Sequence, residues 1–137
     1  MKIDSIKNGI VLDHIKAGKA MDVYHYLQLE KLDCPVAIIK NVKSSKMGKK
    51  DIIKIDCDIE LSFNVLGYVD PNITVNIIKD GVCEKKRLSL PEKIVDVVKC
   101  KNPRCITSVE NVPNIFTLAD RENAVYRCVY CEAEAEK

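Results

Sequence analysis

Four cysteines near the C-terminus, arranged in two close pairs, constrain this chain more than any other feature. Cys100 and Cys105 bracket the segment KNPR, Cys128 and Cys131 bracket VY, and 22 residues separate the two pairs. Two short loops that each supply a pair of thiolates can close a tetrahedral zinc site, with Zn–S distances of about 2.3 Å. Because four protein ligands leave no position for water, the spacing predicts one structural Zn2+ ion per chain.

This cysteine region is small, since a segment of about forty residues buries little apolar surface. Zinc binding is therefore expected to supply much of its folding free energy. Two alternatives remain open: the four residues are ordinary buried cysteines, or RCVYC is a redox C-x-x-C motif. The second pair at a suitable distance argues against both alternatives.

The other three cysteines are interpreted through the expected location of the protein. The N-terminal sequence MKIDSIKNG lacks the apolar segment of a signal peptide, and no apolar run reaches the roughly 18 residues of a membrane span. We therefore expect a cytoplasmic protein with no membrane association, in a reducing compartment where seven cysteines do not pair into disulfides. Cys34, Cys57 and Cys83 have no close partner in the sequence, so we expect them to be small apolar core residues.

Alternating apolar residues in the first 95 positions predict a sheet rich in isoleucine and valine. Helical spacing of Ala20, Val23, Tyr24 and Leu27 predicts a helix within residues 18–32, and a second helix is expected within residues 58–70. The order of elements predicts an α+β fold: an N-terminal ferredoxin-like αβ sandwich, β-α-β-β-α-β plus an extra strand, followed by a small, mostly β zinc-binding domain. We place these domains at residues 1–93 and 94–137. The predicted strands lie at residues 9–15, 35–40, 51–56, 72–78 and 82–88.

Charged and hydrogen-bonding residues on the predicted strands point to a ligand rather than to catalysis. Residues 40–54 contain six lysines and one acid, Asp51, which is also what a solvated loop would contain. Lys54 differs, because strand alternation places it on the face opposite Ile53 and Ile55. Alternation also places Asp13 with Val11 and Ile15, and Asn76 with Thr74 and Ile78. Such faces can hold a base and ribose while nearby lysines contact phosphates, and the sequence contains no evident catalytic nucleophile.

Several of these segments occur together, in the same order, in one known family. They are VLDHI at 11–15, MGKKDIIKI at 47–55, ITVNII at 73–78, SLPEKI at 89–94 and the four cysteines. Over nearly its whole length the chain resembles the regulatory chain of aspartate carbamoyltransferase.

The resemblance implies a chain with no catalytic activity of its own. It implies an N-terminal allosteric domain that binds the nucleoside triphosphates CTP, UTP and ATP, and a C-terminal zinc domain that docks on the catalytic chain. In the family, three regulatory dimers tie two catalytic trimers together, so a regulatory homodimer is expected here. The pyrimidine end product inhibits the enzyme in the family, and ATP generally activates it.

The resemblance also assigns roles to individual residues. Asp13 is expected to contact the ribose, His14 and Lys54 the phosphates, and Lys85 a phosphate from the last strand. Val11, Asn76 and Ile78 are expected to lie near the base and sugar, with Lys50 close by. N-terminal residues also line the nucleotide pocket in the family, and here only MKIDSIKNG precedes the first strand.

A zinc ribbon attached to a basic domain could instead bind nucleic acid. Against this reading, residues 96–137 hold six basic and seven acidic side chains, and the whole chain is only 5% aromatic with no tryptophan. Single-stranded nucleic acid is usually bound through a positive groove and stacking aromatic rings. We therefore expect no nucleic-acid partner.

Overall fold

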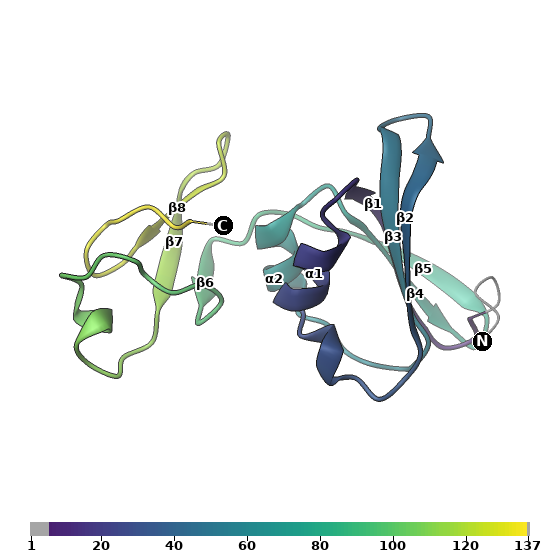
Figure 1. Cartoon of the computed structure of the whole chain (residues 1–137), viewed down its shortest axis with the longest axis horizontal. Helices are drawn as coiled ribbons and strands as arrows, with labels where there is room; N and C mark the ends of the chain where they lie inside the picture. Colours follow the sequence, from purple (N-terminus) through teal and green to yellow (C-terminus); the bar gives the residue numbers. More distant parts are fainter. Residues whose placement is uncertain (1–5, 137) are drawn as a thin grey trace. The chain divides into compact units, whose positions relative to one another are not determined.

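The computed structural model describes residues 6–136, so the first five residues of the N-terminal segment MKIDSIKNG lie outside them. The chain divides into two compact units, one ending at Ser89 and the other beginning at Leu90 (Figure 1). Each unit has its own sheet and its own core, so each is described by itself.

The first unit is a five-stranded sheet with two helices. The strands are arranged in the order β2-β3-β1-β4-β5, and every neighbouring pair is antiparallel. This arrangement is the predicted ferredoxin-like topology with β5 added beside β4. The elements are β1 (Gly9–Lys16), α1 (Ala20–Tyr26), the 3-10 turn η1 (Leu29–Lys31), β2 (Val36–Ser44), β3 (Gly48–Ile55), α2 (Phe63–Val69), β4 (Thr74–Lys79) and β5 (Val82–Arg87).

Helices α1 and α2 cover one face of this sheet (Figure 1). The strand residues that point toward them are fully buried, because alternate side chains of a strand face the same side. Leu12, Ile53 and Val75 are 0% exposed, and they lie opposite one another on β1, β3 and β4. Burial of such side chains is worth roughly 1.5–3 kcal/mol each, which fixes the register of the sheet.

A bulge in β1 changes the sheet face on which one residue, Ile15, was expected to lie. Leu12 lies opposite Ile53 and Ile15 lies opposite Asp51, so β1 contains one extra residue between these pairs. His14 takes up that residue with a left-handed φ of 59°. As a result Ile15 is buried with Leu12, and the prediction that it shares the face of Asp13 is wrong. Simple period-2 counting fails wherever a bulge adds a residue.

The first helix is shorter than its periodic segment. Ala20 and Val23 are buried, as the pattern predicts, but α1 ends at Tyr26. Gln28 then adopts a left-handed φ of 54°, and the chain continues as the turn η1. The second helix, α2, begins after Ser62, whose hydroxyl accepts a hydrogen bond from the N–H of Val65.

The second unit is a three-stranded antiparallel sheet in the order β6-β7-β8. Its small core contains Ile94, Phe116 and Tyr126, each at most 2% exposed. Within residues 6–136 no helix is long and apolar enough to cross a membrane. The elements are β6 (Lys93–Val95), the 3-10 turn η2 (Ile106–Ser108), β7 (Ile115–Asp120) and β8 (Val125–Cys128).

The three cysteines outside the predicted zinc site do not behave alike. Cys83 is exposed on β5, so the prediction that it is a core residue is wrong. Cys34 and Cys57 pack against the core, as expected, but they are also bonded to each other as a disulfide, so the prediction that the cysteines do not pair is wrong for these two. The sequence could not reveal this pairing, because the two residues are 23 positions apart and meet only through strand register.

Candidate functional site

The four paired cysteines of the second unit come together as a cluster. Their Sγ atoms all lie within 4.8 Å of one another. Cys100 and Cys131 are 3.5 Å apart through sulfur, and Cys105 and Cys128 are 3.7 Å apart. Four sulfurs placed tetrahedrally at the usual Zn–S distance would be separated by roughly 3.8 Å. The cluster therefore fits one structural zinc ion, and it supplies all four ligands from the protein.

Short turns place these sulfurs. In the first pair, the Asn102 carbonyl accepts hydrogen bonds from the N–H of Cys105 and the hydroxyl of Ser108, both at 3.0 Å. The Asn102 side chain also accepts from the N–H of Arg104 at 3.1 Å. In the second pair, the N–H of Glu132 donates to the carbonyl of Cys128 at 2.9 Å. The Asn-Pro dipeptide at residues 102–103 is a typical turn signal, and the structure has a turn there.

The cluster prepares some of its thiols to lose a proton. The N–H of Ala133 and the side chain of Asn102 lower the pKa of Cys131 to about 6. The hydroxyl and N–H of Thr107 lower the pKa of Cys105. Burial raises the pKa of Cys100 to about 12. Thiolates are the form that binds zinc, so metal binding at this cluster involves loss of thiol protons.

The candidate nucleotide residues of the first unit lie on the sheet face opposite the helices. Lys54 on β3 is directly opposite Val11 on β1, which is opposite Asn76 on β4, which in turn is opposite Lys85 on β5. Directly opposed residues of an antiparallel sheet share a face, so these four form one row across four strands. The amide of Asn76 donates to the Val11 carbonyl at 3.5 Å, within this row.

A second row contains the acidic member of the set. Asp13 lies opposite Thr74 on β4, which lies opposite Arg87 on β5. The Asp13 carboxylate forms an ion pair with the Lys50 ammonium at 2.9 Å and accepts a hydrogen bond from the N–H of His14. Burial raises the pKa of Asp13, but these interactions more than compensate and hold it below 3.8. Asp13 is therefore ionised at neutral pH and holds Lys50 against the sheet.

The remaining predicted residues lie close to these rows. The imidazole Nδ1 of His14 is 3.1 Å from the hydroxyl of Thr74, so the bulge directs His14 toward β4. Ile78 lies opposite Gly9 and Cys83, in the row on the other side of Val11 and Asn76. Thr74 and Arg87 were not proposed as site residues, although both share this face. Strand alternation had already placed Thr74 on the face of Asn76, whereas only strand pairing reveals Arg87.

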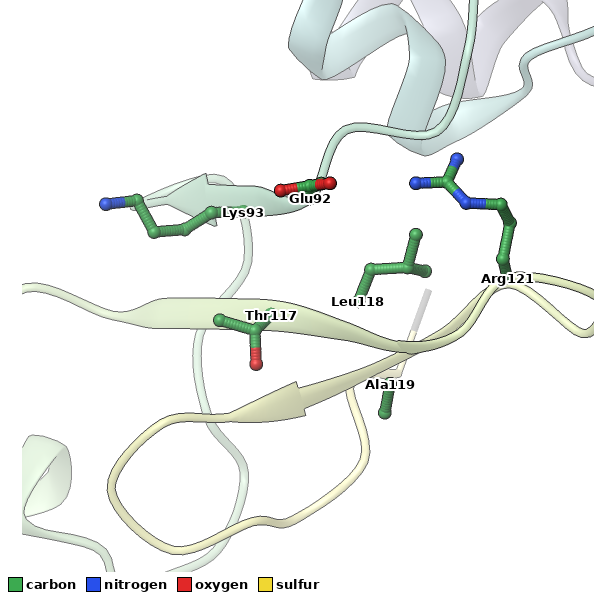
Figure 2. Close-up of a pocket in the computed structure, with 6 residues that line it drawn as sticks. All are labelled: Glu92, Lys93, Thr117, Leu118, Ala119 and Arg121. Carbon is green, nitrogen blue, oxygen red and sulfur yellow. The ribbon is translucent and has the colours of Figure 1, made fainter.

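Two open depressions in the surface contain little of this chemistry. One, of about 640 Å³, lies on the second unit between Glu92, Lys93 and β7 (Figure 2). Leu118 and Arg121 point toward Glu92, while Thr117 and Ala119 point to the other side of β7. The other, of about 690 Å³, lies on the first unit and is bordered by Lys16, Lys49 and Asp70. Neither contains a predicted site residue.

Comparison with known proteins identifies the family. A family model described as "Aspartate carbamoyltransferase regulatory chain, allosteric domain" matches residues 1–89, and one described as "Aspartate carbamoyltransferase regulatory chain, metal binding domain" matches residues 92–137. The chain belongs to the aspartate carbamoyltransferase regulatory chain family. Its members are regulatory, non-catalytic subunits, which confirms the resemblance found in the sequence.

Individual regulatory chains are similar over nearly their full length. The aspartate carbamoyltransferase regulatory chain of Clostridium botulinum strain Hall is 54% identical over 134 residues, which cover 96% of this chain and 92% of the relative. The regulatory chain of Clostridium tetani is 53% identical, with 96% and 94% covered. The regulatory chain of Bifidobacterium longum is 42% identical, with 99% of both chains covered. The structural zinc site in the second unit agrees with the metal-binding domain of this family.

Proposed function

We propose that this chain is the allosteric subunit of a cytoplasmic aspartate carbamoyltransferase in pyrimidine biosynthesis. In this proposal the first unit binds CTP, UTP or ATP on its open sheet face. The second unit docks on the catalytic chain, and regulatory homodimers link catalytic trimers. The match of both domains to regulatory-chain models supports this assignment.

The observation that carries the nucleotide proposal is the row Lys54, Val11, Asn76 and Lys85. The row places an ammonium group at each end and an apolar and an amide side chain between them. A nucleoside triphosphate has matching chemistry, because its base and sugar combine apolar surface with hydrogen-bonding groups and its phosphates are anionic. Asp13, in the adjacent row, offers a carboxylate to the ribose hydroxyls.

Regulation then depends on linkage between the two units. An effector changes the enzyme only through the difference in its affinity for the two quaternary states, typically 1–3 kcal/mol of coupling. The zinc cluster is proposed to transmit this difference by holding the docking surface in one shape.

Calorimetric titration of the full chain with CTP, UTP and ATP tests the nucleotide site. Lys54→Ala is expected to weaken binding of the preferred nucleotide by roughly 1.5–3 kcal/mol, about 10- to 150-fold, because a charged hydrogen bond to phosphate is lost. Lys85→Ala is expected to act in the same direction.

Lys46→Ala is the matched control for Lys54→Ala. It removes the same charge from the same basic stretch, but Lys46 is exposed in the turn between β2 and β3. Only a general electrostatic effect would weaken binding equally in both variants. Unchanged affinity in Lys54→Ala would contradict the proposed site.

A further inference from the structure

Cys34 and Cys57 are outside the zinc cluster and face each other at the end of the β2–β3 pair. Val36 lies opposite Ile55 in this pair, and the N–H of Asp56 donates to the Pro35 carbonyl at 2.9 Å one step further along. One more step on each strand brings Cys34 opposite Cys57. Their Cα atoms are 6.1 Å apart, which lies within the range of about 4.4–6.8 Å that a disulfide can span.

The surroundings of this pair allow a small reagent to reach it. Both side chains are partly buried at the edge of the apolar core, on the helix-covered face of the sheet. Cys34 follows η1, and Cys57 begins the connection that leads to α2. The hydrogen-bonded strands hold the two Cα atoms in place, so the thiols can meet without rearrangement of the fold.

The remaining five cysteines are in different situations. Four form the zinc cluster of the second unit, where metal protects the thiolates. Cys83 is exposed on β5. Among the described cysteines outside the metal cluster, Cys34 and Cys57 are therefore the two that face one another.

We propose that Cys34 and Cys57 are a redox-responsive pair that low-molecular-weight disulfides oxidise reversibly. One thiolate attacks a sulfur of the small disulfide, forms a mixed disulfide and releases one small thiolate. The second cysteine thiolate then attacks the protein sulfur of the mixed disulfide and releases the other small thiolate. Two protein thiols thus lose two electrons, the small disulfide gains them, and the two protons pass to the released thiolates.

Each redox state has a defined structural consequence. The structure has the oxidised, bonded form. In the cytoplasm, the location proposed above, the reducing thiol pool is expected to hold the resting pair as two thiols at the core edge. Oxidation joins the segment before β2 to the segment after β3, at the same end of the strand pair, and closes a loop over a separation of 23 residues. Such a link restricts the unfolded chain, so the first unit is expected to melt roughly 10 °C higher or more when oxidised.

Trypsin allows the pair to be followed directly in the full, zinc-loaded chain. Cleavage after lysine places Cys34 in residues 32–40, Cys57 in residues 55–79 and Cys83 in residues 80–85. The chain is equilibrated with reduced and oxidised glutathione at a series of ratios, alkylated and digested for mass spectrometry. The expected result is a link between the first two peptides that forms as the ratio becomes oxidising and disappears when reduced glutathione is restored.

Cys83 and single-cysteine variants provide the controls. Cys83, being exposed, should take up glutathione under the same conditions and so report that oxidation has occurred. Cys34→Ser should leave Cys57 as a mixed disulfide with glutathione, because the second cysteine is missing, and Cys57→Ser should do the same to Cys34. Neither variant should show the rise in melting temperature.

Three results would overturn the proposal. The first is that Cys34 and Cys57 remain fully alkylated at every ratio while Cys83 is modified, as two inert core residues would. The second is that either cysteine of the wild-type chain links to another chain or accumulates as a mixed disulfide. The third is a link that reduced glutathione does not reverse. The wild-type experiment decides the matter even where a variant fails to fold, and its outcome does not depend on nucleotide binding.

Discussion

At the scale of single residues, Asp51 shows how a charge in a basic stretch can be structural. Its side chain is buried, and the carboxylate accepts hydrogen bonds from three backbone N–H groups. Two of the donors, Gly18 and Ala20, lie at the beginning of α1, and the third, Asn41, lies at the bulge of β2. Asp51 thus satisfies backbone groups of a helix and a bulge at once, which its position among lysines did not reveal.

Asp51→Ala is expected to destabilise the first unit by roughly 3 kcal/mol, because it leaves buried N–H groups without an acceptor. Asp51→Asn should cost less, since its amide oxygen can still accept for part of the set. Urea unfolding of the full chain measures both, with Asp58→Ala, at an exposed position, as the control. Equal midpoints for Asp51→Ala and Asp58→Ala would show that the buried carboxylate contributes nothing.

At the scale of elements, the order of strands and helices was predictable, but local irregularities were not. Isoleucine and valine at alternate positions indicated β1, β3 and β4 because these strands bury one face against the helices. The bulge at His14 depends on pairing between β1 and β3, which are far apart in the chain. Local sequence does not determine such contacts, so the face of Ile15 and the pairing of Cys34 with Cys57 were missed.

The zinc cluster could be predicted because local sequence places its ligands. Each pair of cysteines is close in sequence, so each turn delivers two ligands through local geometry alone. The nucleotide residues were proposed through resemblance and strand alternation together. Strand register then brings them together on one face. The spacing of the residues does not indicate which nucleotide they prefer.

Gly9, at the start of the central strand β1, occupies a position where no side chain fits. A Cβ atom there would collide with the carbonyl oxygen of Ile55 and lie 2.8 Å from Cγ2 of Ile6. The Ile55 oxygen belongs to the backbone of β3 and cannot move without shifting that strand. Gly9→Ala is therefore expected to destabilise the first unit by roughly 1–3 kcal/mol in urea unfolding. Lys7→Ala, at a nearby exposed position, should stay within about 0.5 kcal/mol of the wild type, and a similar value for Gly9→Ala would exclude the close approach.

At the scale of the whole molecule, two units are stabilised by different means. The first has a continuous apolar core beneath two helices, whereas the second has a few buried residues around a thiolate cluster. Structural zinc sites in small domains contribute on the order of 10–16 kcal/mol near neutral pH, more than such a small core supplies. The metal is therefore expected to decide whether the second unit is folded and to leave the first unit unaffected.

Chelation of zinc from the full chain tests this division. Backbone amides in residues 90–137 should lose their protection from hydrogen exchange, while amides of β1, β3 and β4 should keep theirs. Nucleotide binding, if it resides in the first unit, should survive chelation, whereas association with the catalytic chain should be lost. Cys128→Ser should reproduce the effect without a chelator, and Cys83→Ser should retain one zinc per chain because Cys83 lies outside the cluster.

Protected amides throughout residues 90–137 after complete removal of zinc would show that the apolar core alone folds the second unit. Loss of protection in both units would show instead that they fold as one, so that the metal could not act as a separate support for the docking surface.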